Sequence, residues 1–128
     1  MFWMHEVAVM SQIIELVLSE AKKRDAEQVS RVNLEIGEYT FLGEEQMRFA
    51  FEVLSKGTVA EGADLDITTR RGVVECSCGY SGAPEQPEDI HILAPILMCP
   101  KCGKIANVKE GLGCTVRDIS MVVPDVQA

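Results

Sequence analysis

The sequence predicts an α+β fold, in which two helices pack on a mixed three-stranded sheet and a cysteine-rich subdomain interrupts the second half of the chain. Two segments repeat apolar residues at helical spacing, three segments alternate apolar and polar residues, and two cysteine pairs precede the last alternating segment. We expect residues 1–74 and 107–128 to form the helix–sheet domain and residues 75–106 to form the insert.

The first helix is predicted from a continuous apolar face near the start of the chain. Basic residues at positions 22–24 follow this face, where positive charge interacts favourably with the C-terminal end of the helix dipole. The residues of the face are Val7, Met10, Ile14, Val17, Leu18 and Ala21. This spacing is typical of a helix that buries one side.

A strand and a second helix follow. The strand alternates Val32, Leu34 and Ile36 with polar neighbours, which predicts one buried and one exposed face. The second helix begins after Gly43 and ends before Gly57, because glycine favours helix ends. Its expected core face contains Met47, Ala50, Phe51 and Leu54.

Two further strands complete the predicted sheet. The first begins with the alternating residues Leu65, Ile67 and Thr69. The last strand changes register near Arg117 and Asp118, which predicts a bulge there. Its apolar residues are Leu112, Cys114, Val116, Ile119, Met121 and Val123. We expect this strand to return to the first sheet.

Two cysteine pairs predict a zinc ribbon. Cys76 and Cys78 are separated by one residue, Cys99 and Cys102 are separated by two, and a glycine follows each pair. Four thiolates so placed can complete a tetrahedral Zn(II) site, which would staple an insert too small to fold by burial alone. Four protein ligands leave no open position for a reacting water, so the predicted zinc is structural. The fifth cysteine, Cys114, is expected to be a buried thiol.

Composition and charge narrow the class of function. The formal charge is -8, from 12 basic and 20 acidic side chains, which disfavours binding to nucleic acid because that binding depends on neutralising phosphates. No apolar run approaches the roughly 18 residues of a membrane span, and no secretory signal pattern is present. An odd number of cysteines does not suit a disulfide framework. We therefore expect a cytoplasmic protein with no membrane span.

Four motifs resemble those of the HypA/HybF family of nickel metallochaperones. They are Met4–Glu6 at the start of the first helix, Ile36–Glu38 after the first strand, Gly57–Ala63 after the second helix, and the two cysteine pairs. The resemblance covers nearly the whole chain. It implies that the protein carries Ni(II) as transient cargo and, with a partner GTPase of the HypB type, delivers it to the large subunit of nickel-iron hydrogenase. Some members also serve urease maturation, and a homodimer is compatible with this role.

The candidate nickel ligands lie at the start of the first helix. His5 and His91 are the two histidines of the chain, and imidazole is a favoured ligand for nickel. If Met4 is the first residue, its amine, the neighbouring backbone nitrogens and the His5 imidazole can form the nitrogen-rich square plane that Ni(II) favours. Because Met1–Trp3 precede this motif, either Met4 is the biological start or the longer protein binds nickel through a changed set of donors.

Three further residues have open roles. Glu6 is expected to supply its backbone nitrogen or to place its carboxylate behind the nickel ligands, although an acid in the first helical turn also has a structural reason. His91 resembles a histidine that archaeal-type members carry between the cysteine pairs, from where it would reach the nickel if the insert swings inward. Family members usually have two residues between the first cysteines, so their register would place Glu75 at the zinc. We assign that ligand to Cys76, which is adjacent and softer.

Other function classes are consistent with the cysteines alone. A zinc-ribbon adaptor that binds other proteins would need no nickel and would survive the loss of His5. A rubredoxin-type electron carrier would bind iron at the same thiolates, but the large metal-free domain and the one-residue spacing argue against it. An enzyme is not expected, because the sequence shows no nucleophile with its base, no open metal site and no phosphate-binding glycine loop.

Overall fold

The computed structural model describes residues 4–84 and 97–124. The chain forms two compact units, each built from separate segments. The first unit contains Met1–Glu35, Leu42–Thr68 and Thr115–Ala128, and the second contains Ile36–Phe41 and Thr69–Cys114. The segment 75–106, for which the sequence predicts an insert, lies within the second unit.

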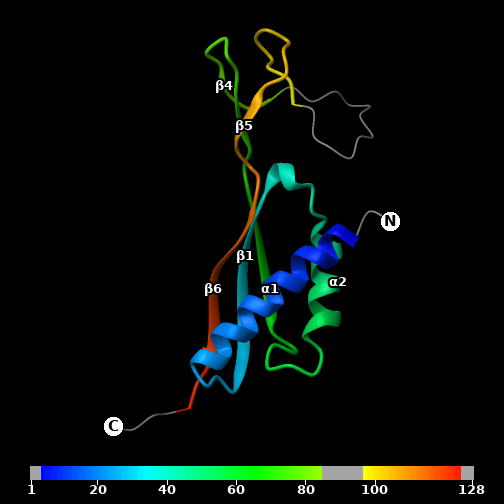
Figure 1. The fold of residues 1–128 in the computed structure, drawn as a ribbon, viewed down its shortest axis with the longest axis vertical. Helices are drawn as coiled ribbons and strands as arrows, with labels where there is room; N and C mark the ends of the chain where they lie inside the picture. The colour runs from blue at the N-terminus through cyan, green and yellow to red at the C-terminus, as the bar shows by residue number, and fades with distance from the viewer. Residues whose placement is uncertain (1–3, 85–96, 125–128) are drawn as a thin grey trace. The chain divides into compact units, whose positions relative to one another are not determined.

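A three-stranded sheet forms the centre of the first unit (Figure 1). In this sheet β1 (Gln28–Gly37) lies between β2 (Asp64–Arg70) and β6 (Cys114–Val122). The last strand therefore lies beside the first, as the sequence predicts.

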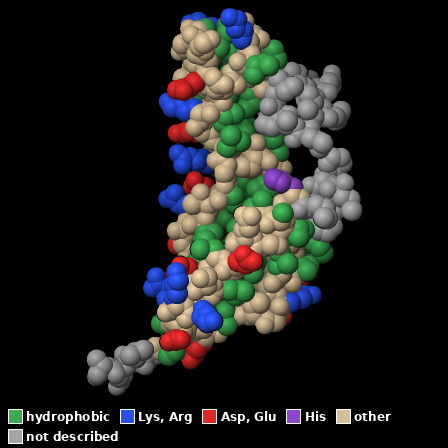
Figure 2. All heavy atoms as spheres, in the orientation of Figure 1, with side chains coloured by type: hydrophobic (Ala, Val, Ile, Leu, Met, Phe, Trp, Pro, Cys, Tyr) green, Lys and Arg blue, Asp and Glu red, His purple; other side chains and the backbone are tan. Residues whose placement is uncertain are grey.

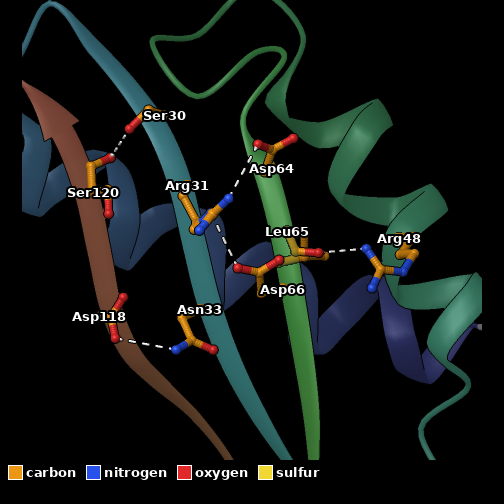
Figure 3. Close-up of polar contacts among 9 residues, drawn as sticks. All are labelled: Ser30, Arg31, Asn33, Arg48, Asp64, Leu65, Asp66, Asp118 and Ser120. Atoms are coloured by element: carbon orange, nitrogen blue, oxygen red, sulfur yellow. Dashed lines mark hydrogen bonds and ion pairs between the residues drawn. The ribbon is translucent and has the colours of Figure 1, made fainter.

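The strands β1 and β2 run parallel, because the contacts between them advance along both strands in the same direction. The Arg31 guanidinium pairs with the carboxylates of Asp64 at 3.9 Å and Asp66 at 3.2 Å (Figure 3). Further along, the Thr68 hydroxyl donates to the carbonyl of Leu34 at 3.3 Å. A parallel pair needs a long crossover connection, and here that connection contains the second helix.

The strands β1 and β6 run antiparallel. The Ser30 hydroxyl donates to the carbonyl of Ser120 at 3.1 Å, and the side-chain amide of Asn33 donates to the carboxylate of Asp118 at 3.3 Å (Figure 3). Residue numbers thus rise along β1 as they fall along β6. One parallel and one antiparallel pair make a mixed sheet, which confirms the prediction.

Both predicted helices are present, as α1 (Met4–Lys23) and α2 (Glu44–Ser55). In Figure 3 α1 passes behind the strands, and α2 lies beyond the edge strand β2. The helices and strands bury a common apolar core, whose fully buried side chains include Met10, Val17, Val29, Val32, Leu34 and Met47. Neither of these two helices combines the length and the apolar character needed to cross a membrane.

The last strand shows the predicted change of register. Half-buried and exposed residues alternate along β6 except at Arg117 and Asp118, which are both exposed. The prediction that Leu112 belongs to the buried face is wrong, because this side chain is 62% exposed and lies before β6. Positive φ angles of 109° at Gly111 and 105° at Gly113 turn the chain on either side of Leu112 and end the alternation there.

Three short strands form a second sheet that sequence analysis did not identify. In this sheet β3 (Val73–Glu75) lies between β4 (Ser81–Gly82) and β5 (Asn107–Glu110), and both pairs are antiparallel. Val74 is fully buried at the centre of β3. Strands this short cannot show the sustained alternation by which longer strands are recognised.

Tyr39 fills the space between two glycines of the second unit. It lies in the 3-10 turn η1 (Glu38–Thr40) and is only 5% exposed. A Cβ atom at Gly72 would overlap the Tyr39 ring, and one at Gly111 would lie 2.9 Å from it. Tyr39 belongs to the buried cluster of this unit, together with Val74, Cys76, Leu97, Cys99 and Ala106. The absence of a side chain at Gly72 therefore allows the ring to reach this core.

Replacing Gly72 by Ala should destabilise the protein, because the rigid Tyr39 ring cannot make room for a methyl group. Overpacking of this kind typically costs about 1–3 kcal/mol, which urea denaturation can measure as a loss in the free energy of unfolding. Gly43→Ala is the matched control, since its added methyl group meets the end of the flexible Gln46 side chain. An equal loss of stability in both variants would contradict the packing argument.

Candidate metal centre

Four cysteine side chains converge in the second unit. The Sγ atoms of Cys76, Cys78, Cys99 and Cys102 all lie within 4.8 Å of one another. The Sγ atoms of Cys76 and Cys102 are 3.4 Å apart, and those of Cys78 and Cys99 are 3.7 Å apart. A tetrahedral zinc with bonds of about 2.3 Å requires sulfur separations of about 3.8 Å. The arrangement of the four donors therefore fits a tetrahedral metal ion.

Each cysteine pair is shaped by a tight turn that ends in glycine. The N–H of Gly79 donates to the carbonyl of Cys76 at 2.9 Å, and the N–H of Gly103 donates to the carbonyl of Cys99 at the same distance. The φ angles are 99° at Gly79 and 76° at Gly103, a region that residues with a Cβ rarely adopt. The two turns present the sulfur atoms of both pairs to a common point.

The side chains of the adjacent residues Cys76 and Glu75 lie in different environments. Cys76 is buried, and its Sγ atom belongs to the four-thiol cluster. The Glu75 carboxylate is 54% exposed and pairs with the Lys109 ammonium at 3.2 Å. The cluster of described residues therefore contains the cysteine and not the glutamate, even though the two are adjacent in sequence.

The thiols of the cluster differ in acidity. A hydrogen bond from the backbone of Cys78, followed by one from the Cys102 thiol, lowers the pKa of Cys76 to about 7. The backbone of Lys104 lowers the pKa of Cys102, but the Cys76 thiol, burial and the other two cysteines outweigh it and raise the pKa to about 11. A metal binds thiolates, so occupation of this cluster must release protons.

The fifth cysteine lies apart from the cluster. Cys114 begins β6 and is half-buried, and burial raises the pKa of its thiol. A thiol in this environment is a small apolar side chain with low reactivity. The structure therefore gives Cys114 no part in the four-thiol centre.

Of the four residues predicted to bind nickel, three lie in the part of the chain that the structure describes. Met4 begins α1, and the His5 side chain is exposed on its first turn. The Glu6 side chain is buried, with 5% of the residue exposed. Its Oε2 atom accepts a hydrogen bond from the N–H of Gly43 at 2.8 Å. Its Oε1 atom is buried and has no hydrogen-bond partner among the described residues. His91 lies outside the described residues. Sequence analysis missed Gly43, because nothing in its local sequence points to a residue 37 positions away.

Comparison with known proteins gives close matches over nearly the whole chain. Residues 4–121 match the model of the family described as "Hydrogenase/urease nickel incorporation, metallochaperone, hypA". The hydrogenase maturation factor HypA of Methanothermobacter thermautotrophicus is 39% identical over 95% of this chain and 100% of that protein. The HypA of Methanopyrus kandleri is also 39% identical, over 97% of both chains.

The fold matches solved structures as well. The solution structure of the Ni metallochaperone HypA from Helicobacter pylori superposes with a TM-score of 0.62 at 27% identity, covering 93% of this chain and 98% of that one. These matches, together with the four-cysteine centre, define a metal-handling maturation factor and not an enzyme. More narrowly, the chain belongs to the HypA family of nickel metallochaperones for hydrogenase maturation.

Replacing Cys76 by Ser should greatly reduce the metal content of the purified protein, because the tetrahedral site then loses one of its four thiolates. Mass spectrometry with inductively coupled plasma measures the metal bound per chain. Glu75→Gln is the matched control: it removes only the exposed ion pair with Lys109 and should leave the metal content unchanged. Loss of metal from Glu75→Gln and retention in Cys76→Ser would identify the glutamate as the ligand.

Proposed function

We propose that this protein binds Ni(II) at its N-terminal motif and delivers it during maturation of nickel-iron hydrogenase, while a structural Zn(II) ion occupies the four-cysteine centre. The observation that carries the proposal is the family match, which begins at Met4 and so includes the exposed His5 on the first turn of α1. An exposed imidazole suits a metal that must be taken up and released again.

The proposed nickel donors belong to the Met4–Glu6 motif and to His91. The His5 imidazole and the nitrogen atoms of the neighbouring backbone, with the Met4 amine if the chain begins there, supply the in-plane nitrogen ligands that Ni(II) favours. This geometry disfavours magnesium and calcium, which prefer oxygen ligands, so selectivity rests on ligand type and geometry. His91 is proposed as a further donor from the segment between the cysteine pairs.

The proposed zinc has a structural role. The second unit has strands of two to four residues, and few side chains are buried in the part of it that the structure describes. A cross-link between its two cysteine turns would therefore add stability that so small a core cannot supply. The donor set of four thiols and their separations of 3.4 and 3.7 Å support zinc, which favours tetrahedral sulfur coordination.

The proposed partners are a HypB-type GTPase, the large subunit of nickel-iron hydrogenase and, for some clients, urease maturation proteins. If delivery uses a GTPase activity, that activity belongs to the partner, because the sequence shows no phosphate-binding glycine loop. We place the protein in the cytoplasm, where its five free cysteines would remain reduced, and we leave a homodimer open.

Binding to nucleic acid is not part of the proposal. The chain carries a net charge of -8, and Figure 2 shows basic and acidic side chains interspersed on the visible surface. Several basic residues pair with acids, among them Arg31, Arg48, Arg70, Lys109 and Arg117. Such a surface does not gather the positive charge that binding to phosphates requires.

A second candidate function is a zinc-ribbon adaptor that binds other proteins without nickel. Two large apolar side chains of the second unit favour it, since Ile105 is 74% exposed and Leu112 is 62% exposed. An adaptor would need these side chains to form part of a contiguous apolar patch, which is what marks a protein interface. A nickel chaperone needs His5 as a metal ligand, whereas an adaptor would keep its function without His5.

Calorimetric titration of Ni(II) into zinc-loaded protein tests the proposed function. The form that begins at Met4 should bind one Ni(II) per chain, and His5→Ala in that form should abolish binding, because a principal in-plane donor is lost. The full chain, measured in parallel, shows whether Met1–Trp3 change the donors. Binding should weaken as pH falls, since the nitrogen donors must lose their protons.

The adaptor hypothesis predicts the opposite result in this titration. If neither form binds Ni(II) while the zinc content stays at one ion per chain, nickel binding is excluded and the adaptor becomes the better description. Binding that survives His5→Ala unchanged would also contradict the proposed site.

A further inference from the structure

The N-terminal ends of both helices meet at one side chain, that of Glu6. Glu6 lies in the first turn of α1, and its Oε2 atom accepts the N–H of Gly43 at 2.8 Å. Gly43 is the N-cap residue of α2 and has no side chain with which to cap that helix. Because the N-terminus of a helix carries partial positive charge, both helix ends favour a carboxylate at this point.

The first turn of α2 has a possible hydrogen-bond acceptor within the helix itself. Gln46 stands three residues after the N-cap, where a glutamine side chain commonly reaches back to the N-cap N–H. Its side-chain oxygen lies beside Gly43, at the place where a Cβ atom would be. A local acceptor is therefore at hand, yet the N–H of Gly43 is bound by Glu6 from α1. The bond therefore links α1 to the N-terminus of α2, although an acceptor within α2 lies close by.

The second oxygen of Glu6 indicates that this link serves more than stability. Its Oε1 atom is buried and has no hydrogen-bond partner among the described residues, and Glu6 as a whole is 5% exposed. Burying an unpaired carboxylate oxygen is unfavourable, and such atoms are rare in folded proteins unless a bound ligand or a functional role accounts for them.

Helical geometry separates Glu6 from the neighbouring His5. Consecutive residues of an α-helix point in directions about 100° apart, so the two side chains do not face each other. In agreement, His5 is exposed and Glu6 is buried. Glu6 is thus placed to hold the first turn of α1 from the inside, while His5 presents its imidazole on the outside.

We propose that the Glu6 carboxylate positions the nickel ligands and is not itself a nickel donor: its bond to the N–H of Gly43 fixes the first turn of α1 against the N-terminus of α2 and so orients His5 for the metal. This inference rests on the proposed nickel-binding function and assigns a role within it to Gly43, a residue outside the N-terminal motif.

Four variants of zinc-loaded protein separate these roles, each made in the full chain and in the form that begins at Met4. Gly43→Pro removes the N–H that Glu6 accepts, and the Gly43 φ of -74° suits proline. The Cβ atom that it adds meets the end of the flexible Gln46 side chain. Glu6→Ala removes the carboxylate, whereas Glu6→Gln keeps an oxygen that can accept the same bond. Glu44→Pro is the matched control, because the first helical position tolerates proline and the Gly43 ψ of 127° suits a residue before proline.

Nickel affinity by calorimetry and the visible absorption of bound Ni(II), which reports its coordination geometry, are measured for each variant. We expect Gly43→Pro and Glu6→Ala to weaken nickel binding at least tenfold and to shift the absorption bands. Glu6→Gln and Glu44→Pro should stay within about threefold of the parent protein and keep its spectrum. A purely structural role would lower thermal stability without changing the spectrum.

Two patterns would overturn the inference. Weak binding in both Glu6 variants together with normal binding in Gly43→Pro would make Glu6 a nickel donor, and normal binding in all four variants would reduce the link to a structural contact. If Gly43→Pro fails to fold, by circular dichroism and zinc content, the comparison of Glu6→Ala with Glu6→Gln still decides between donor and positioning residue. Failure of the parent protein itself to bind Ni(II) would instead refute the proposed function, and the inference with it.

Discussion

The convergence of four thiols is the constraint on which the second unit depends. Its three short strands contain two to four residues each, and two of the buried side chains among its described residues, Cys76 and Cys99, are themselves members of the cluster. The core and the metal centre are therefore one structure. Losing the metal would leave four separate thiols, two buried and two exposed, in place of a cross-link, so we attribute the shape of this unit to coordination more than to burial.

The first unit could be predicted from sequence because its elements are long and amphipathic. The 20 residues of α1 and the 10 of β1 each repeat their pattern often enough to identify the buried face. The second sheet could not be predicted, because β3, β4 and β5 have only two to four residues each, too few for an alternating pattern to identify them. The prediction that Leu112 is buried failed for a related reason: the alternation in the sequence continues through two glycines at which the chain turns.

The candidate site, too, could be predicted from the sequence only in part. Spacing identified the four cysteines, because residues separated by one or two positions and followed by glycine have few other common uses. Spacing left Glu75 and Cys76 as competing ligands, and only the three-dimensional arrangement turns Glu75 outward to Lys109. The link between Glu6 and Gly43 was beyond sequence reasoning, since a side-chain bond across 37 positions has no local signature.

The two proposed metal sites make opposite demands on the protein. A structural ion should remain bound, and four thiolates complete the tetrahedral coordination of such an ion. A cargo ion must be exchanged with a partner, which favours a ligand such as His5 that is exposed at the end of a helix. Exposure alone would leave that ligand poorly oriented, and geometry is what distinguishes nickel from its competitors. A buried carboxylate behind an exposed imidazole meets both demands, because it fixes the direction of the ligand without enclosing the metal.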